Sequence, residues 1–385
     1  MRCQMTNSDT AQFVLQALNA IKKSCEDVLE KNPDIIKSGI IDNLSGTIFL
    51  VQKIRKSKES KTIGFFGAQK RGKSSLINQL IGCDLMPISP IPMSSVAIEI
   101  EQATIPDGQF KIDIFQASGK KEMSQKVDLE RAKMILREYG SHKGILSSEV
   151  DTIKVSSSFP DSVIMRNHGV LVDTPGAEIA FDWGETTDIT NNEDAKRAIS
   201  ILQKTHIVVF VERADQMESN NSKQFFEMHL RPMRPLGVLN WKDEFGKNDP
   251  KYEKIALPLR EQTKIRDMQT IMLKTYGFNL DRLLCVSCKD AANAKRNNNN
   301  ELLQESNLPL LEKKILEELQ NLNPDRGLVT CFEELESTLQ QIKDIDLARS
   351  VFKKAQRPFY VFLRKETNET IKRIANEILN RYCSN

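Results

Sequence analysis

The sequence predicts an α/β domain with a mainly parallel central sheet, flanked by helices that both ends of the chain contribute. Three observations lead to this expectation. Short apolar runs alternate with helical patterns between residues 61 and 322. The two ends of the chain carry helical patterns alone. A glycine-rich loop follows the first apolar run and precedes a helical pattern, which is typical of a phosphate-binding loop.

The composition is that of an ordinary globular chain. Of 385 residues, 39% are hydrophobic and 28% are charged, and the net charge is +3. So small a net charge argues against general electrostatic binding of nucleic acid, and no nucleic-acid partner is expected. The seven cysteines are scattered, which suits a reducing compartment, and the apolar runs are too short to span a bilayer. We therefore expect a cytoplasmic protein, with peripheral attachment to a membrane left open.

The first 60 residues read as two helices around a break at Lys31–Asp34. Apolar residues recur at spacings of three and four on both sides of this break. They are Val14, Leu18, Ile21, Cys25 and Val28, then Ile40, Leu44, Ile48, Val51 and Ile54.

The middle of the chain contains the expected strands. Short apolar runs, separated by helical patterns or turns, indicate strands of an α/β sheet. The runs are Thr62–Phe66, Val96–Glu101, Lys111–Phe115, Thr152–Ser156, Gly169–Val172, Ile207–Val211, Gly237–Leu239 and Leu283–Ser287.

The last 63 residues, 323–385, are expected to form two further helices around a break at Pro358. Their apolar positions are Leu335, Leu339, Ile342 and Ile345, then Ile371, Ile374, Ile378 and Tyr382. The stripes at both ends of the chain have partners of comparable length only in each other, so we expect one bundle. The predicted domains are therefore 1–60 and 323–385 for the bundle and 61–322 for the α/β domain.

The strongest motif is Gly67–Ser74, a full match to G-x-x-x-x-G-K-[ST] between a predicted strand and a predicted helix. Glycines allow backbone N–H groups to close around phosphate oxygens, and the helix N-terminus adds positive potential. Lys73 is expected to reach the β- and γ-phosphates, and the Ser74 hydroxyl to bind Mg²⁺.

Three later motifs favour GTP over ATP. Asp173 ends a strand in the sequence D-T-P-G, where it would hold Mg²⁺ through water while the N–H of Gly176 meets the γ-phosphate. Asn240–Asp243 follows another strand as N-x-x-D, and Asp243 can accept hydrogen bonds from guanine N1 and N2. Ser287–Lys289 ends the last strand, where a backbone N–H can meet guanine O6. Four motifs in this order predict a GTP-binding domain.

Together these residues resemble the dynamin-like GTPases, most closely the bacterial members. Met86–Ser94 is similar to the family's approach to switch I, with Ser94 at the position of a threonine that contributes a hydroxyl to Mg²⁺. The interval of 106 residues between Gly67 and Asp173 is similar to that of the family's enlarged G domain. Val208–Asp215 is similar to the strand and loop that face a partner G domain.

The resemblance implies a homodimer through the G domain and a role in membrane remodelling, with GTP as substrate and Mg²⁺ as cofactor. The expected catalytic residues are Lys70, Lys73 and Ser94, and the expected metal ligands are Ser74, Ser94 and Asp173. The expected nucleotide-binding residues are Gly67, Ala68, Gln69, Lys70, Arg71, Gly72, Lys73, Ser74, Ser75, Asp173, Gly176, Asn240, Lys242, Asp243, Ser287, Cys288 and Lys289.

The chain departs from the family pattern at three positions and from many small GTPases at a fourth. Trp241 replaces a lysine that lies along the base, and Ser94 replaces a threonine. Lys70 either adds positive charge near the β,γ-bridge or faces solvent. Ala177 follows the D-T-P-G motif at the position where many small GTPases have a glutamine that orients water, which an alanine cannot do. We therefore expect slow hydrolysis by the monomer and faster turnover on self-association.

Two other patterns are interpreted as structural. The spacing Cys285-x-x-Cys288 has no second pair of ligands, so core packing is favoured over a zinc or redox site. The block Lys353–Lys365 is basic, then aromatic, then basic. It either contacts an anionic membrane or packs its aromatic part in the bundle, and packing is favoured.

The sequence as a whole predicts a dynamin-like GTPase that hydrolyses GTP to GDP and phosphate and moves a helical bundle. The alternative is a GTP-dependent switch or scaffold that recruits a protein partner without membrane contact. The expected partner beyond GTP, GDP and a second copy is thus an anionic membrane surface or another protein.

Overall fold

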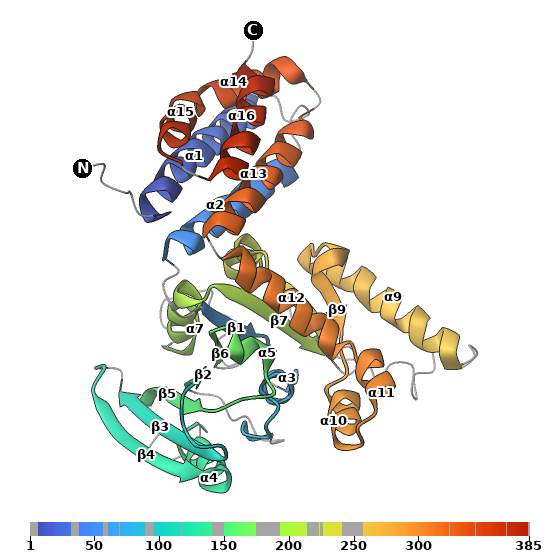
Figure 1. Ribbon diagram of the computed structural model, residues 1–385. Helices are drawn as coiled ribbons and strands as arrows, with labels where there is room; N and C mark the ends of the chain where they lie inside the picture. Colours follow the sequence, from blue (N-terminus) through green and yellow to red (C-terminus); the bar gives the residue numbers. More distant parts are fainter. Residues whose placement is uncertain are drawn as a thin grey trace. The chain divides into compact units, whose positions relative to one another are not determined.

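The structure is a computed structural model and is described for residues 7–31, 38–56, 61–68, 70–88, 96–116, 118–140, 150–174, 193–213, 223, 226–240, 257–322, 324–342, 344–366 and 368–383. The chain divides into two compact units. The helical unit comprises Met1–Lys58 and Glu318–Asn385, and the α/β unit comprises Glu59–Glu317 (Figure 1). In the described residues, no helix is long and apolar enough to cross a membrane.

Nine strands form one sheet in the described part of the α/β unit, in the order β4-β3-β5-β2-β6-β1-β7-β8-β9. Strands β6, β1, β7, β8 and β9 are parallel to one another, and β2 is parallel to β5. In contrast, β2 is antiparallel to β6, and β3 is antiparallel to β5 and β4. The strands are β1 Lys61–Phe66, β2 Ala97–Gln102, β3 Gln109–Gln116, β4 Lys121–Asp128, β5 Val150–Ser157, β6 Gly169–Asp173, β7 Ile207–Arg213, β8 Leu236–Asn240 and β9 Leu283–Cys285. This confirms the predicted α/β class with a parallel centre.

The burial of the side chains in a strand agrees with the position of that strand in the sheet. In β7 every residue from Ile207 to Glu212 is buried, as expected for a central strand with both faces covered. At the edge, β4 has the sequence KEMSQKVD and is almost entirely exposed. Charged side chains protect such an edge from further strand pairing. Because β4 has no apolar run, the sequence pattern missed it.

Helices cover the sheet and connect its strands (Figure 1). The apolar residues Phe210, Phe226, Met272 and Tyr276 belong to one core cluster of this unit, which joins β7 to α9. The helices are α3 Lys73–Ile81, α4 Leu129–Gly140, α5 Val163–Arg166, α7 Glu193–Lys204, α9 Leu257–Tyr276, α10 Cys288–Arg296, α11 Asn300–Glu305 and α12 Leu308–Asn321.

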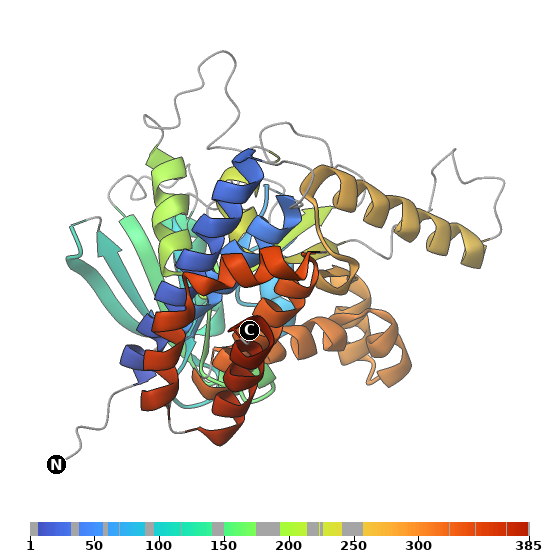
Figure 2. The same ribbon diagram turned by 90° about the horizontal axis from the view of Figure 1, so that it is seen from above.

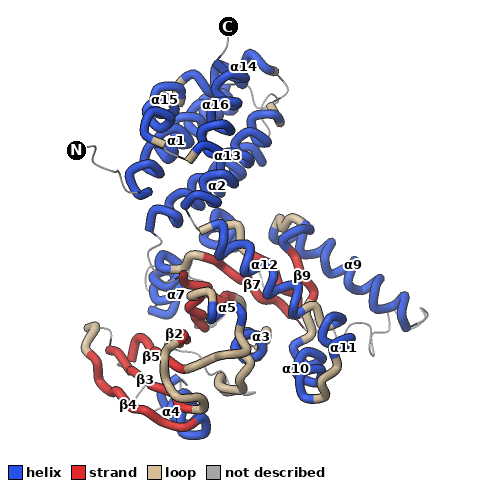
Figure 3. Tube along the Cα trace, viewed as in Figure 1, coloured by secondary structure: helices blue, strands red, loops and turns tan. Residues whose placement is uncertain are grey.

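The helical unit has a core to which both ends of the chain contribute, as predicted. Figure 3 shows that its regular elements are helices throughout, and Figure 2 shows α1 beside the C-terminal helices from a second direction. One hydrophobic cluster includes Leu18 and Leu44 from the N-terminal helices and Phe332 and Ile378 from the C-terminal ones. The helices are α1 Asn7–Lys31, α2 Ser38–Lys56, α13 Pro324–Gln340, α14 Ile345–Lys353, α15 Gln356–Lys365 and α16 Glu369–Cys383.

The prediction of two C-terminal helices was wrong, since the described residues contain four. The stripe from Leu335 to Ile345 is divided because Asp344 accepts hydrogen bonds from the N–H groups of Asp346 and Leu347 and so caps a new helix, α14. Pro358 lies in the first turn of α15, where a missing N–H has no cost, and does not mark a break.

The block Lys353–Lys365 packs its apolar part in the core of the helical unit, which is the interpretation that the sequence favoured. Phe359 and Phe362 are each 1% exposed, and their ring centroids lie 5.5 and 5.2 Å from the ring centroid of Phe332. Tyr360 is 48% exposed, and the Arg357 and Arg364 side chains are exposed as well. The block therefore has a buried aromatic face and an exposed basic face.

Candidate functional site

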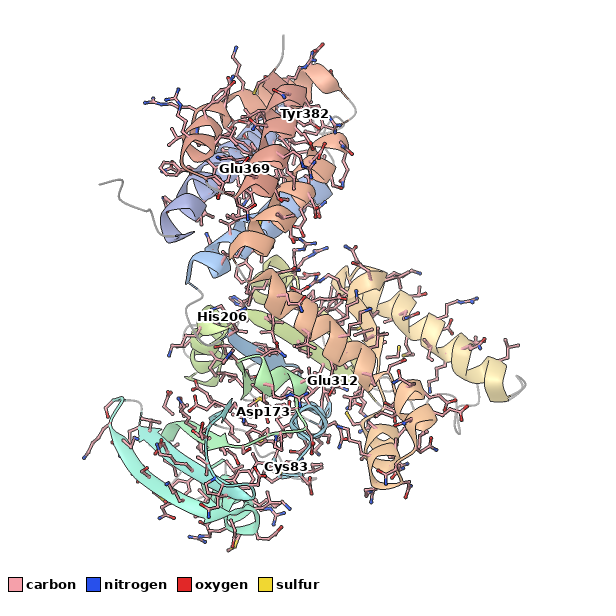
Figure 4. The ribbon with its side chains drawn as sticks, in the orientation of Figure 1. Cys83, Asp173, His206, Glu312, Glu369 and Tyr382 are labelled. Carbon is pink, nitrogen blue, oxygen red and sulfur yellow. The ribbon has the colours of Figure 1, made fainter. Side chains whose placement is uncertain are left out.

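The candidate site lies where the parallel strands of the α/β unit end. The loop Gly67–Gly72 connects β1 to α3, and Asp173 is the last residue of β6, directly opposite Phe65 of β1. Asn240 ends β8, and Ser287 follows β9. Because the carboxyl ends of parallel strands share one edge of a sheet, four separate motifs converge there. Asp173 lies in this region, beside α3 (Figure 4).

Gly67 opens the loop in a conformation that requires glycine. Its φ is +142°, and a Cβ atom would lie 2.1 Å from the carbonyl oxygen of Val211 in β7. Gly72 has a φ of +90° and caps the N-terminus of α3. The loop thus passes close to β7 and then turns sharply into the helix, a backbone path that is typical of phosphate-binding loops.

Lys73 is buried, and its ammonium group lies within the loop. Its Nζ donates hydrogen bonds to the carbonyl oxygens of Gly67 and Ala68 at 2.8 and 2.9 Å. Lys70 is exposed, with a φ of +59°. Both interpretations of Lys70, catalytic and solvent-facing, stay predictions.

Ser74 and Asp173 meet beside the loop. The Ser74 hydroxyl donates a hydrogen bond to Asp173 Oδ2 at 2.9 Å, while Asp173 Oδ1 is buried without a hydrogen-bond partner in the described residues. Burial raises the pKa of the Asp173 carboxyl, and the Lys73 charge and the Ser74 hydrogen bond act against this rise. A hydroxyl oxygen and a carboxylate with an unsatisfied oxygen are a donor set that fits Mg²⁺.

A pocket of about 450 Å³ lies between α3 and α10. Asn240 lines this pocket and is buried, and its Nδ2 donates a hydrogen bond to the Arg71 carbonyl at 3.4 Å. Ser287 caps α10 by accepting a hydrogen bond from the N–H of Asp290. The pocket is lined by Ser75, Asn78, Gln79, Asp84, Ile88, Asn240, Cys288, Lys289, Ala292 and Arg296.

Most predicted residues of the phosphate loop and the base loop are thus near one another, but several lie outside the described residues. These are Gln69, Ser94, Gly176, Ala177, Trp241, Lys242 and Asp243. The predicted packing of Cys285 and Cys288 agrees with their burial at 5% and 9% exposure.

The side chain of Arg71 is directed into the protein, which the motif did not indicate. It is 5% exposed and its Nε lies 3.3 Å from Glu212 Oε2. Its predicted contact with nucleotide is therefore restricted to the backbone.

Two further polar residues position the site. The Thr174 hydroxyl donates to the Phe65 carbonyl at 2.6 Å and fixes the end of β6 to β1. Asn78 accepts from the N–H of Met86 and donates to its carbonyl, at 2.7 and 2.9 Å, and so anchors the segment that follows α3. Asn78 could have been recognised in the sequence as a polar residue within the apolar face of the predicted helix.

Parts of this chain are similar to known proteins. Residues 63–240 match the profile of the family described as the dynamin family. An uncharacterized protein in the xynA 3′ region of Caldicellulosiruptor sp. (strain Rt8B.4) is 26% identical over 312 residues, which cover 80% of this chain and 67% of that protein.

Similar chains occur in solved structures of an oligomerised bacterial dynamin pair described in connection with long-range sensing and tethering of membranes. One is 15% identical and the other 17%, with TM-scores of 0.48 and 0.47. The matches cover 99% and 98% of this chain but 51% and 62% of those chains, so this chain spans little more than half of their length. The family match runs from β1 to the end of β8, so this part of the α/β unit is similar to the dynamin family.

Proposed function

We propose that this chain binds GTP with Mg²⁺ and hydrolyses it to GDP and phosphate. The observation that carries the proposal is the group formed by Lys73, Ser74 and Asp173. A buried ammonium group, a hydroxyl and a partly unsatisfied carboxylate lie together at the opening of a phosphate loop. This is the combination of charge and oxygen ligands that a magnesium triphosphate requires.

The described residues have distinct roles in this proposal. The N–H groups of the loop bind the β-phosphate, and Lys73 exchanges its two carbonyl partners for phosphate oxygens. Ser74 and Asp173 hold Mg²⁺, which when bound neutralises charge on the β- and γ-phosphates. Asn240 fixes the base loop to the phosphate loop through the Arg71 carbonyl. Lys70, at the exposed turn of the loop, supplies further positive charge to the transition state.

The finer parts of the proposal concern Ser94, Gly176, Lys242 and Asp243. Ser94 completes the metal ligands, Gly176 meets the γ-phosphate, and Lys242 and Asp243 belong to the guanine-recognising loop. Ala177 offers no polar group for the attacking water. We therefore propose that self-association through the G domain completes the water-binding site, and that turnover then moves the helical unit.

Equilibrium binding of a fluorescent GTP analogue tests the core of this proposal. The full chain is expected to bind the analogue in Mg²⁺, with GTP but not ATP competing, and Lys73→Ala is expected to weaken binding at least about a hundredfold. Lys120→Ala, which changes an exposed lysine in a turn, is the matched control. Binding by Lys73→Ala equal to that of the control would refute the proposed site.

The helical unit provides one observation in favour of each alternative, membrane remodelling and a membrane-free switch. The burial of Phe359 and Phe362 removes two aromatic rings from any lipid contact and favours the switch. Arg357, Tyr360 and Arg364, spaced by three and four residues on α15, are exposed and favour an anionic surface.

Sedimentation with phosphatidylserine vesicles distinguishes the two functions. The triple variant Arg357→Ser, Tyr360→Ser and Arg364→Ser keeps the buried phenylalanines, and Lys372→Ser with Arg373→Ser removes two exposed or half-exposed charges from α16 as a control. Membrane remodelling predicts GTP-dependent sedimentation that the triple variant alone loses. A chain that stays in the supernatant with GTP supports the switch.

A further inference from the structure

The phosphate loop is joined to the core by a buried ion pair. Arg71, within the loop, is 5% exposed, and Glu212, near the end of β7, is 1% exposed. The Arg71 Nε and the Glu212 Oε2 are 3.3 Å apart. The Tyr276 hydroxyl, at the C-terminal end of α9, donates a hydrogen bond to Glu212 Oε1 at 3.4 Å. One loop, one strand and one helix are thus connected by three polar side chains.

This group lies next to an aromatic cluster. The ring of Tyr276 is 4.9 Å from that of Phe226 and 5.1 Å from that of Phe210. Burial and the Glu212 carboxylate raise the pKa of the Tyr276 hydroxyl, which therefore stays protonated and able to donate. A buried ion pair has a large desolvation cost, and apolar side chains of similar volume often give equal or greater stability. Stability alone is therefore a weak reason for this pair.

The backbone around Arg71 indicates another role. Arg71 stands between two residues in a left-handed backbone conformation, Lys70 with a φ of +59° and Gly72 with a φ of +90°. A left-handed conformation is unfavourable at a residue with a side chain, such as Lys70, and must be held by its surroundings, which include Arg71. Arg71 is held on two sides, because its carbonyl accepts the Asn240 hydrogen bond while its side chain pairs with Glu212.

We propose that Arg71 is a positioning residue: its ion pair with Glu212 holds the phosphate loop in its anion-binding conformation and keeps it in register with the base loop at Asn240. Tyr276 extends this support to α9 by fixing the Glu212 carboxylate. The inference rests on the proposed function, because it concerns the affinity of the same site for a nucleotide.

The test uses the full chain and separates positioning from stability. The double variant Arg71→Met with Glu212→Leu replaces the pair by apolar side chains, and Tyr276→Phe removes the hydroxyl but keeps the ring. For each, thermal unfolding is measured together with the dissociation rate of a fluorescent GDP analogue and the KM and kcat for GTP. Lys120→Ala serves as control.

The double variant is expected to unfold within a few degrees of the unmodified chain but to release GDP about tenfold faster and to show a raised KM. Tyr276→Phe is expected to release GDP about threefold faster. Arg71→Lys, which retains the charge, is expected to recover part of the slow release.

Release of GDP at the unmodified rate by a folded double variant would overturn the inference, and so would an unmodified rate for Tyr276→Phe if the double variant does not fold. Failure of the unmodified chain itself to bind the analogue would instead refute the proposed function.

Discussion

At the scale of single residues, the approach of Gly67 to β7 is the tightest constraint on the phosphate loop. A methyl group at this position would meet the Val211 carbonyl oxygen at 2.1 Å, and a backbone oxygen in a central strand has little freedom to move. The positive φ of +142° adds a second cost for any residue with a side chain. Steric and conformational effects therefore act together at Gly67.

Gly67→Ala is expected to destabilise the α/β unit by more than about 3 kcal/mol and to abolish nucleotide binding, because the loop must move away from β7. Gly119→Ala is the matched control, since Gly119 also has a positive φ of +77° but a Cβ atom there would meet no atom within 4 Å. The control is expected to cost only about 1 kcal/mol. Thermal unfolding of both variants measures the difference, and equal losses would show that the contact with Val211 is unimportant.

Asp173→Asn tests the metal ligand without changing the size of the side chain. The variant is expected to lose at least about a hundredfold in kcat and to bind GTP equally with and without Mg²⁺, because an amide is a poorer Mg²⁺ ligand than a carboxylate. Asp107→Asn, in an exposed turn, is the control. Magnesium-dependent hydrolysis by Asp173→Asn at the unmodified rate would remove Asp173 from the proposed site.

At the scale of secondary structure, the core of the helical unit depends on α15. Phe359 packs against Phe332 from α13 and Phe352 from α14, with ring centroids 5.5 and 5.0 Å apart. Tyr382 of α16 lies 5.8 Å from Phe352 and belongs to the same core (Figure 4). One aromatic network therefore holds four helices from the end of the chain together.

Phe359→Ala is expected to cost about 3–5 kcal/mol of unfolding free energy, because it leaves a cavity in this network. Tyr360→Ala changes the neighbouring residue, which is half-exposed, and is expected to cost less than about 1 kcal/mol. Urea unfolding followed by circular dichroism compares them. Similar losses for both variants would contradict the orientation of α15.

Cys25 gives the helical unit a predicted dependence on pH. Burial, with a smaller effect of Glu26, raises the pKa of the Cys25 thiol from 9.0 to about 11. Between about pH 8 and pH 10 the unfolded thiol ionises while the folded one does not, so the folded state loses about 1 kcal/mol. Urea unfolding at both pH values is expected to show this loss relative to Cys25→Ala. An identical pH dependence in the variant would contradict it.

The elements that the sequence predicted are those with strong apolar patterns. Strand β1 was expected at Thr62–Phe66 and is found at Lys61–Phe66, and the helical stripes of α1 and α2 lie in one core as expected. Strand β4 was missed because its stability comes from pairing with β3, which a single strand's composition does not show.

The candidate site was predictable where a motif requires a particular backbone, as at Gly67, or a particular side-chain chemistry, as at Lys73 and Asp173. The partners of Arg71 were not predictable in this way. Glu212 and Tyr276 are 141 and 205 residues further along the chain, and only the parallel pairing of β1 with β7 brings the loop and Glu212 together. Contacts between distant segments depend on topology, which no local pattern records.

At the scale of the whole molecule, the α/β unit brings the glycine-rich loop, the carboxylate proposed to bind Mg²⁺ and the residue that begins the proposed base loop to one edge of a nine-stranded sheet of described strands. The helical unit has its own core from both ends of the chain. The proposed function connects the two units, because the nucleotide state of the α/β unit is proposed to move the helical unit.

The measurement that tests this account most directly is GTP turnover per enzyme as a function of protein concentration, with Lys73→Ala as the blank and ATP as competitor. We expect turnover that requires Mg²⁺, rises with protein concentration, is unaffected by ATP and is absent from Lys73→Ala. A rate per enzyme that stays flat over a wide range of concentration, or that ATP suppresses as effectively as unlabelled GTP does, would contradict a self-activating GTPase.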